Sequence, residues 1–187
     1  MGNPTHFLVD RVGKNLDDAI ELLAQVSTEF KGYWQKNYRD RCNETSEIAL
    51  KNFDFIVNEI LRKRDDLAYC SDNQYINAFK RLLSYRLGKI AVDITPFDLN
   101  IFDPARVGNA ILPVGRETKE ISLSRLLNKI KHRCTYQINF RIENDEHILV
   151  IGADKFRDEP KSIVEFNVRE FCEECQKVSE LIKSKTN

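Results

Sequence analysis

The spacing of apolar residues changes near Cys134, and this change does most to limit what the chain can fold into. Before that point, apolar side chains recur at every third or fourth position, which predicts amphipathic helices. Beyond it the period is two, because Tyr136, Ile138, Phe140 and Ile142 alternate with polar residues, as in a half-buried strand. Four helices are expected, over 16–36, around 49–63, over 73–89 and over 122–133.

Two further apolar runs, 147–152 and 162–166, predict strands that continue from the one beginning at Tyr136. Short loops separate the three, so we expect a small three-stranded antiparallel β-meander. Asn167 with Glu170 three residues later resembles a capping box, which predicts a C-terminal helix. The fold class is therefore predicted as α+β, a predominantly helical bundle with this meander and a final helix.

The domain organisation follows from the same pattern. Residues 1–135 are expected to form the helical bundle, and residues 136–187 the meander and C-terminal helix, packed on the same core. Within the first part, residues 91–119 hold three prolines and two glycines without a sustained period. That composition predicts a long surface connection.

Length and charge exclude several classes of protein. A chain of 187 residues with 42% hydrophobic side chains can bury one substantial core. Its 29 basic residues balance 29 acidic ones, so a polyanion or an anionic membrane must be met by a local patch. No apolar run is long enough to span a membrane and no signal peptide is evident, which predicts a cytoplasmic protein without a membrane partner. Five cysteines, an odd number, fit reduced thiols.

The predicted helix over 122–133 carries a strongly basic face. Arg125 and His132 are seven residues apart and project within about 20° of each other, roughly 10.5 Å apart along the helix axis. Between Glu120 and Gln137 the sequence has no acidic residue. We call the polar side of this segment the basic face; its members are Arg125, Asn128, Lys129, Lys131, His132 and Arg133.

These residue types suit the cleavage of RNA. Neighbouring cations disfavour the protonated form of a histidine, so the His132 imidazole can act as a base for a 2′-hydroxyl near neutral pH. Arginine and lysine can hold a phosphate and stabilise its developing charge. Lys129, Lys131 and Arg133 are the expected RNA contacts.

The stretch RLLNKIKHR, residues 125–133, resembles the signature helix of the HEPN superfamily of small helical domains, where an arginine precedes a histidine by four to six intervening residues. Many members of that family are metal-independent endoribonucleases of defence systems that act as dimers, and others are binding partners. The resemblance implies His132 as the acid or base, Arg125 as the phosphate ligand and Asn128 as an orienting residue. It also implies RNA and a second copy of the chain as partners.

Three other interpretations stay open. The basic face is equally typical of a solvated helix side, or of a nucleic-acid contact without catalysis. The chain can also be a non-enzymatic interaction or scaffold protein that uses the helix over 122–133 and the 91–119 connection as its surface. Whether the chain is an enzyme is therefore left undecided.

No cofactor or metal is expected. Cys172 and Cys175, with His132 and Cys134, supply four zinc-type ligands on paper. Cys172 and Cys175, however, fall on the apolar stripe of the last helix, where buried thiols are ordinary core residues. Nucleotide-binding glycine motifs are absent from the sequence, and Trp34 at helical spacing from Phe30 is predicted as core.

Overall fold

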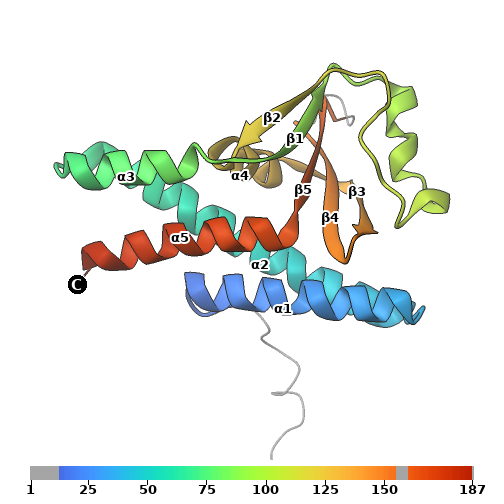
Figure 1. The fold of residues 1–187 in the computed structure, drawn as a ribbon, viewed down its shortest axis with the longest axis horizontal. Helices are drawn as coiled ribbons and strands as arrows, with labels where there is room; N and C mark the ends of the chain where they lie inside the picture. The colour runs from blue at the N-terminus through green and yellow to red at the C-terminus, as the bar shows by residue number, and fades with distance from the viewer. Residues whose placement is uncertain (1–12, 155–159, 187) are drawn as a thin grey trace, which may run out of the picture.

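The computed structural model describes residues 13–154 and 160–186 and joins helices to one antiparallel sheet (Figure 1). Its elements in chain order are α1 (Leu16–Gln35), α2 (Arg39–Asp66), η2 (Leu67–Tyr69), α3 (Asn73–Leu83), β1 (Arg86–Val92), η3 (Pro96–Phe102), η4 (Pro104–Arg106), β2 (Thr118–Ser122), α4 (Leu123–Lys131), β3 (Arg133–Glu143), β4 (Glu146–Ala153), β5 (Ser162–Asn167) and α5 (Val168–Thr186). The strands form a five-stranded sheet in the order β2-β1-β5-β4-β3.

The predicted three-stranded meander is therefore wrong, although the α+β character holds. Strands β3, β4 and β5 lie where the alternation and the apolar runs placed them. Two more strands, β1 and β2, extend the sheet beyond β5, because β1 pairs antiparallel with both β5 and β2. The two added strands flank the 91–119 segment, whose ends belong to β1 and β2 and whose middle contains the 3-10 helices η3 and η4.

The helix predicted over 73–89 stops at Leu83 and the chain turns into β1. Gly88 explains why a helix does not continue there. Its φ of +94° is a left-handed conformation, and a Cβ at this position would lie 2.4 Å from the Glu165 carbonyl oxygen. The apolar residues after it, Ile90 and Ala91, are buried in the sheet and not on a helix.

Helix boundaries are set locally by capping side chains. The Asn15 side chain accepts a hydrogen bond from the Asp18 amide at 3.0 Å, and Asp72 accepts one from the Tyr75 amide at 3.0 Å. Asn167 likewise accepts from the Arg169 amide at 2.9 Å, so α5 follows β5 without a loop. Each cap satisfies an amide that has no partner within its helix.

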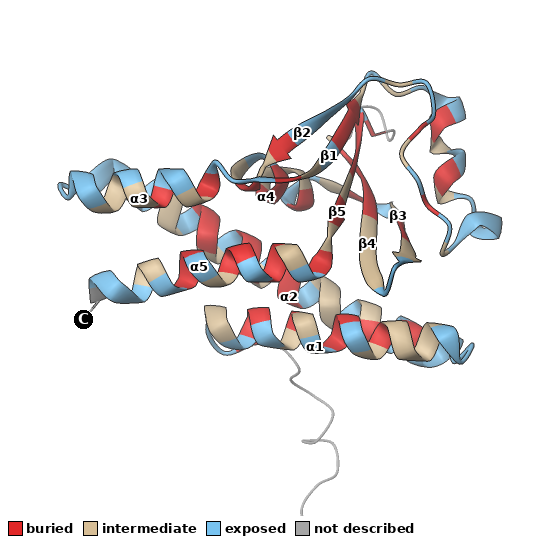
Figure 2. Ribbon diagram, viewed as in Figure 1, coloured by how far each residue is buried: buried red, intermediate tan, exposed pale blue. Residues whose placement is uncertain are grey.

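The two faces of the sheet are covered differently. The helices pack on one face, and the segment between β1 and β2 covers part of the other (Figures 1 and 2). Alternation along β5 shows this directly, because Val164 and Phe166 belong to the helix-side core whereas Ile163 packs with Ile101 of η3. Both faces of the central strands are therefore buried.

Candidate functional site

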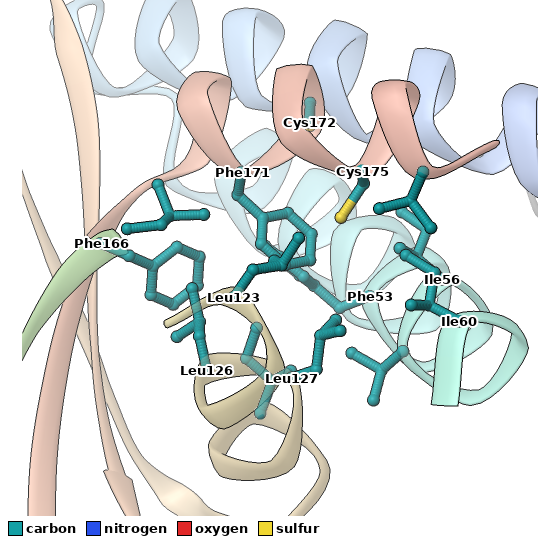
Figure 3. Packing of buried hydrophobic residues seen from close by; sticks show 14 of the residues in the cluster. Phe53, Ile56, Ile60, Leu123, Leu126, Leu127, Phe166, Phe171, Cys172 and Cys175 are labelled. Carbon is teal, nitrogen blue, oxygen red and sulfur yellow. The ribbon is translucent and has the colours of Figure 1, made fainter. Parts of the chain in front are cut away.

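The apolar side of α4 holds the basic face in place. Leu123, Leu126 and Leu127 are fully buried and lie close to Phe53, Phe166 and Phe171 in the core (Figure 3). The Ser122 hydroxyl accepts a hydrogen bond from the Arg125 amide at 3.3 Å and caps the helix. The helix ends at Lys131, with His132 as its C-cap residue, as the sequence predicted to within two residues.

Three residues of the basic face are exposed to solvent: Arg125, Lys131 and His132. In the part of the chain that the structure describes, their side chains make no hydrogen bond or ion pair. The His132 carbonyl, in contrast, accepts a hydrogen bond from the Asp154 amide at 3.1 Å, which fixes the backbone at the end of α4.

The other three residues of the basic face hold the fold together. The Lys129 ammonium pairs with the Asp154 carboxylate and lies 3.3 Å from the Ser162 hydroxyl. The Arg133 guanidinium pairs with Asp54 of α2. The Asn128 amide donates to the Ser124 carbonyl at 2.8 Å. The sequence window around α4 contains no acid, but the fold brings two carboxylates to it from elsewhere.

The hollow at His132 does not include Arg125. His132 lines an open hollow of about 520 Å³ with Lys131, Arg133, Asp154 and Lys161, and Arg125 is not part of that lining. Burial alone would raise the pKa of Asp154, but its contacts with Lys129 and Ser162 outweigh burial and hold the pKa below 3.8. The lining of the hollow therefore includes one carboxylate charge beside its cations.

A larger hollow, of about 600 Å³, lies among α1, α2, β3 and β4. We call it the aromatic pocket. Most of its lining is apolar or aromatic, and the few polar groups are hydroxyls, amides, one histidine and one arginine. The residues used below are Ser27, Phe30 and Trp34 of α1, Arg39, Cys42, Asn43, Ser46 and Ala49 of α2, Val107 after η4, Asn139 and Phe140 of β3, and His147 of β4.

Four rings form one wall of this pocket. Phe30 and Trp34 lie nearly parallel, with ring centroids 6.2 Å apart, and Phe140 packs edge-on against both at 4.7 Å. The His147 ring is parallel to Phe30 at 5.0 Å. Such parallel and edge-to-face pairs are the preferred arrangements of aromatic rings, so the four rings orient one another in the wall.

His147 is the titratable group inside the aromatic pocket. Its Nδ1 atom lies 2.9 Å from the Ser27 hydroxyl oxygen in a hydrogen bond. Burial, with a smaller contribution from the charge of Lys31, lowers the pKa of His147 to about 4. The imidazole is therefore neutral near pH 7 and can donate or accept a hydrogen bond without carrying charge.

The rim of the pocket is held by one buried amide. Asn139 donates to the Ile101 and Arg106 carbonyls at 2.5 and 3.1 Å and accepts from the Gly108 amide at 3.1 Å. These bonds fasten the η3–η4 segment to β3 and place Val107 at the rim. The Arg39 guanidinium, which also lines the pocket, lies 3.6 Å from the centroid of the Trp34 ring.

Sequence reasoning missed this pocket. Trp34 was predicted as core, whereas it forms part of a pocket wall and is only partly buried. The available signal was a row of small residues on α2, where Cys42, Ser46 and Ala49 recur at helical spacing opposite large aromatic residues. Small side chains on one helix face leave space, but only the tertiary arrangement shows whether another element fills it.

No group of three or more metal-ligating side chains is placed to bind a metal ion within residues 13–154 and 160–186. Cys172 and Cys175 lie in the apolar core near Phe171 (Figure 3). Nor does any described helix combine the length and apolarity needed to cross a membrane.

Comparison of the chain with models of protein families, with characterised proteins and with solved structures gives no match. The resemblance of residues 125–133 to the HEPN signature therefore stays a prediction.

Proposed function

We propose that this protein binds a small organic molecule in the aromatic pocket. The observation that carries the proposal is the size of that space. Protein interiors pack at the density of organic crystals, and voids larger than a water molecule are few. A hollow of about 600 Å³ exceeds any such packing defect and falls in the range of small-molecule sites, roughly 300–1,000 Å³.

The lining supports a ligand with a flat apolar body. Phe30, Trp34 and Phe140 contribute aromatic surface, and the Ser27–His147 pair contributes a neutral hydrogen-bonding group. Apolar walls supply most of the binding free energy, while a few fixed polar groups orient the ligand. The pocket therefore fits the pattern of a binding site and not that of a surface for a large partner.

A fluorescence titration tests this proposal. We expect the neutral probe phenylnaphthylamine to bind the purified protein with saturable fluorescence enhancement and one site per chain. The variant Ser46→Phe places a ring inside the pocket and should abolish binding. The matched control is Glu47→Phe, which adds the same ring to an adjacent exposed position outside the lining. Equal binding by both variants would contradict the proposal.

A second candidate function is contact with RNA through the exposed part of the basic face. The observation that favours it is that Arg125, Lys131 and His132 are exposed, with no hydrogen bond or ion pair of their side chains among the described residues. The charges of Arg125 and Lys131 are therefore available to phosphates on the surface that the described residues form. Because Arg125 lies outside the hollow that His132 lines, this geometry favours binding over cleavage.

RNA binding and cleavage are separable in one set of measurements. The double variant Arg125→Gln with Lys131→Gln should weaken binding to a labelled single-stranded RNA and flatten its salt dependence. The control variant Lys51→Gln removes one charge from the exposed side of α2 and should change binding less. RNA cleavage that persists in a chelator and disappears in His132→Ala would instead support the nuclease prediction.

A further inference from the structure

The aromatic pocket takes its charge from one residue. Arg39 is the only charged side chain among the described residues that line it. The lining also contains a histidine, His147. Its pKa is about 4, so it is neutral at physiological pH. The lining therefore carries one positive charge, at its rim, with no carboxylate to balance it.

The position of the Arg39 guanidinium suits the recognition of an anion. It stacks over Trp34 at 3.6 Å, and no ion pair to it occurs within the part of the chain that the structure describes. Arg41, two residues later, points to a different partner and pairs with Glu44 at 2.8 Å. A guanidinium stacked on an aromatic face keeps its N–H groups free at its edge, where they can donate two parallel hydrogen bonds to one carboxylate.

A second donor lies one helical turn along α2. Asn43 is exposed and also lines the pocket, at the (i, i+4) position relative to Arg39. Its side-chain amide makes no hydrogen bond among the described residues. Among the described residues, the rim thus presents a cation stacked on Trp34 and an amide without a hydrogen bond, directly beside an apolar, aromatic interior.

We infer that the ligand of the aromatic pocket is an amphipathic organic anion with a single acidic group. Its carboxylate or sulfonate lies against Arg39 and Asn43, and its flat or aliphatic body lies among Phe30, Trp34 and Phe140. This inference rests on the proposed function of the pocket. A polyanion such as RNA does not fit, because one cation cannot balance a row of phosphates and the remaining walls are apolar.

Two probes that differ in one charged group test the inference. Anilinonaphthalene sulfonate carries the anion, and phenylnaphthylamine has a closely similar ring system without it. We expect the wild-type protein to bind the sulfonate more tightly than the neutral probe. Arg39→Gln should weaken binding of the sulfonate by about tenfold or more, the size of effect typical for loss of a charge-assisted hydrogen bond. Binding of the neutral probe should change by less than about twofold.

Two further variants separate local recognition from general attraction. Arg39→Lys keeps the charge but loses the planar fork and should give an intermediate affinity for the sulfonate. Arg41→Gln removes a cation of the same helix outside the lining and should leave both affinities unchanged. Because Arg39 and Arg41 are exposed, thermal unfolding should confirm that all three variants fold.

The outcomes test the anionic nature of the ligand separately from ligand binding in the aromatic pocket. If the neutral probe binds and Arg39→Gln does not selectively weaken the sulfonate, the anionic ligand is overturned while the pocket remains a binding site. If neither probe binds the wild-type protein, both proposals fall. Weakening of the sulfonate by Arg41→Gln to the same extent as by Arg39→Gln would also overturn the inference.

Discussion

The Arg133 guanidinium and the Asp54 carboxylate form a two-point ion pair, with Nη1–Oδ1 and Nη2–Oδ2 distances of 2.6 and 3.0 Å. Arg133 also donates to the Ile130 carbonyl at 3.0 Å, at the end of α4. The pair joins the first residue of β3 to the middle of α2. A residue that the sequence predicted as an RNA contact is therefore occupied in fastening the sheet to a helix.

Replacing either partner should destabilise the fold modestly. Asp54 is 52% exposed, so solvent screens the pair, and a double-mutant cycle with Asp54→Ala and Arg133→Ala should give a coupling of about 0.5–1 kcal/mol. Urea unfolding of the four proteins measures it. The matched control is the one-point pair Arg62–Glu59, where we expect a weaker coupling because the Arg62 side chain is more exposed than that of Arg133. Equal couplings for the two pairs would contradict a structural role for the bidentate geometry.

The histidine in the aromatic pocket should make stability depend on pH. The pKa of His147 is lowered from 6.5 to about 4 in the folded protein, so the unfolded chain binds the extra proton between those values. Stability then rises with pH across that window and is lost as pH falls from about 6.5 toward 4. Across the whole window, the free energy of unfolding should change by an amount of the order of 3 kcal/mol.

Unfolding in urea between pH 4 and 7 measures this dependence. His147→Gln keeps a hydrogen-bonding group for Ser27 but cannot titrate, so its stability should change less over the same window. The control His132→Gln removes the imidazole at the exposed C-cap of α4, outside the aromatic pocket, and leaves His147 in place. If the free energy of unfolding changed with pH by the same amount in His147→Gln and in the wild type, His147 would not be the titrating group.

Local pattern was sufficient for the elements with a single clear period. Helix α1 ends one residue before its predicted end, and β3 contains the whole of the predicted alternation. Strand β1 was missed because the apolar residues Leu87 and Ile90 continue the helical spacing of α3, and only the pairing of β1 with β5 and β2 in the folded protein shows that this segment is a strand. Strand β2 was missed because Ile121 is its only buried residue.

The site was less predictable than the fold for a related reason. Amphipathicity alone placed Arg125 and His132 on an exposed surface, since it depends on residues three and four apart. The partners of Lys129 and Arg133 are Asp154, directly after β4, and Asp54 of α2, and no local window contains them. The aromatic pocket depends entirely on such distant contacts.

Asn139 should be a sensitive position because one buried side chain serves several backbone groups. Asn139→Ala leaves the Ile101 carbonyl and the Gly108 amide without their hydrogen-bond partner, and we expect a loss of about 2–3 kcal/mol. The η3–η4 segment should also become more sensitive to protease. Urea unfolding and limited proteolysis check both effects. Asn109→Ala, at an exposed site in the same segment, should change neither.

The cysteines should differ widely in reactivity toward iodoacetamide. The Lys185 ammonium, 2.6 Å from the Cys70 sulfur, and the Asp72 amide lower the pKa of Cys70 below 9.0. Burial raises the pKa of Cys172 to about 12 and that of Cys175 further above its usual value. Since the thiolate is the reactive form, Cys70 should be alkylated first in the native protein.

Mass spectrometry of peptides after timed alkylation at pH 8 measures each rate. Lys185→Ala should slow alkylation of Cys70 several-fold, because the thiolate loses its nearest cation. Lys183→Ala, on the same helix but paired with Asp17, should leave the rate unchanged. Cys172 and Cys175 should react only when the protein unfolds, so their labelling reports the opening of α5 from the core. Alkylation of Cys175 in the native protein as fast as that of Cys70 would contradict the packing of α5 described above.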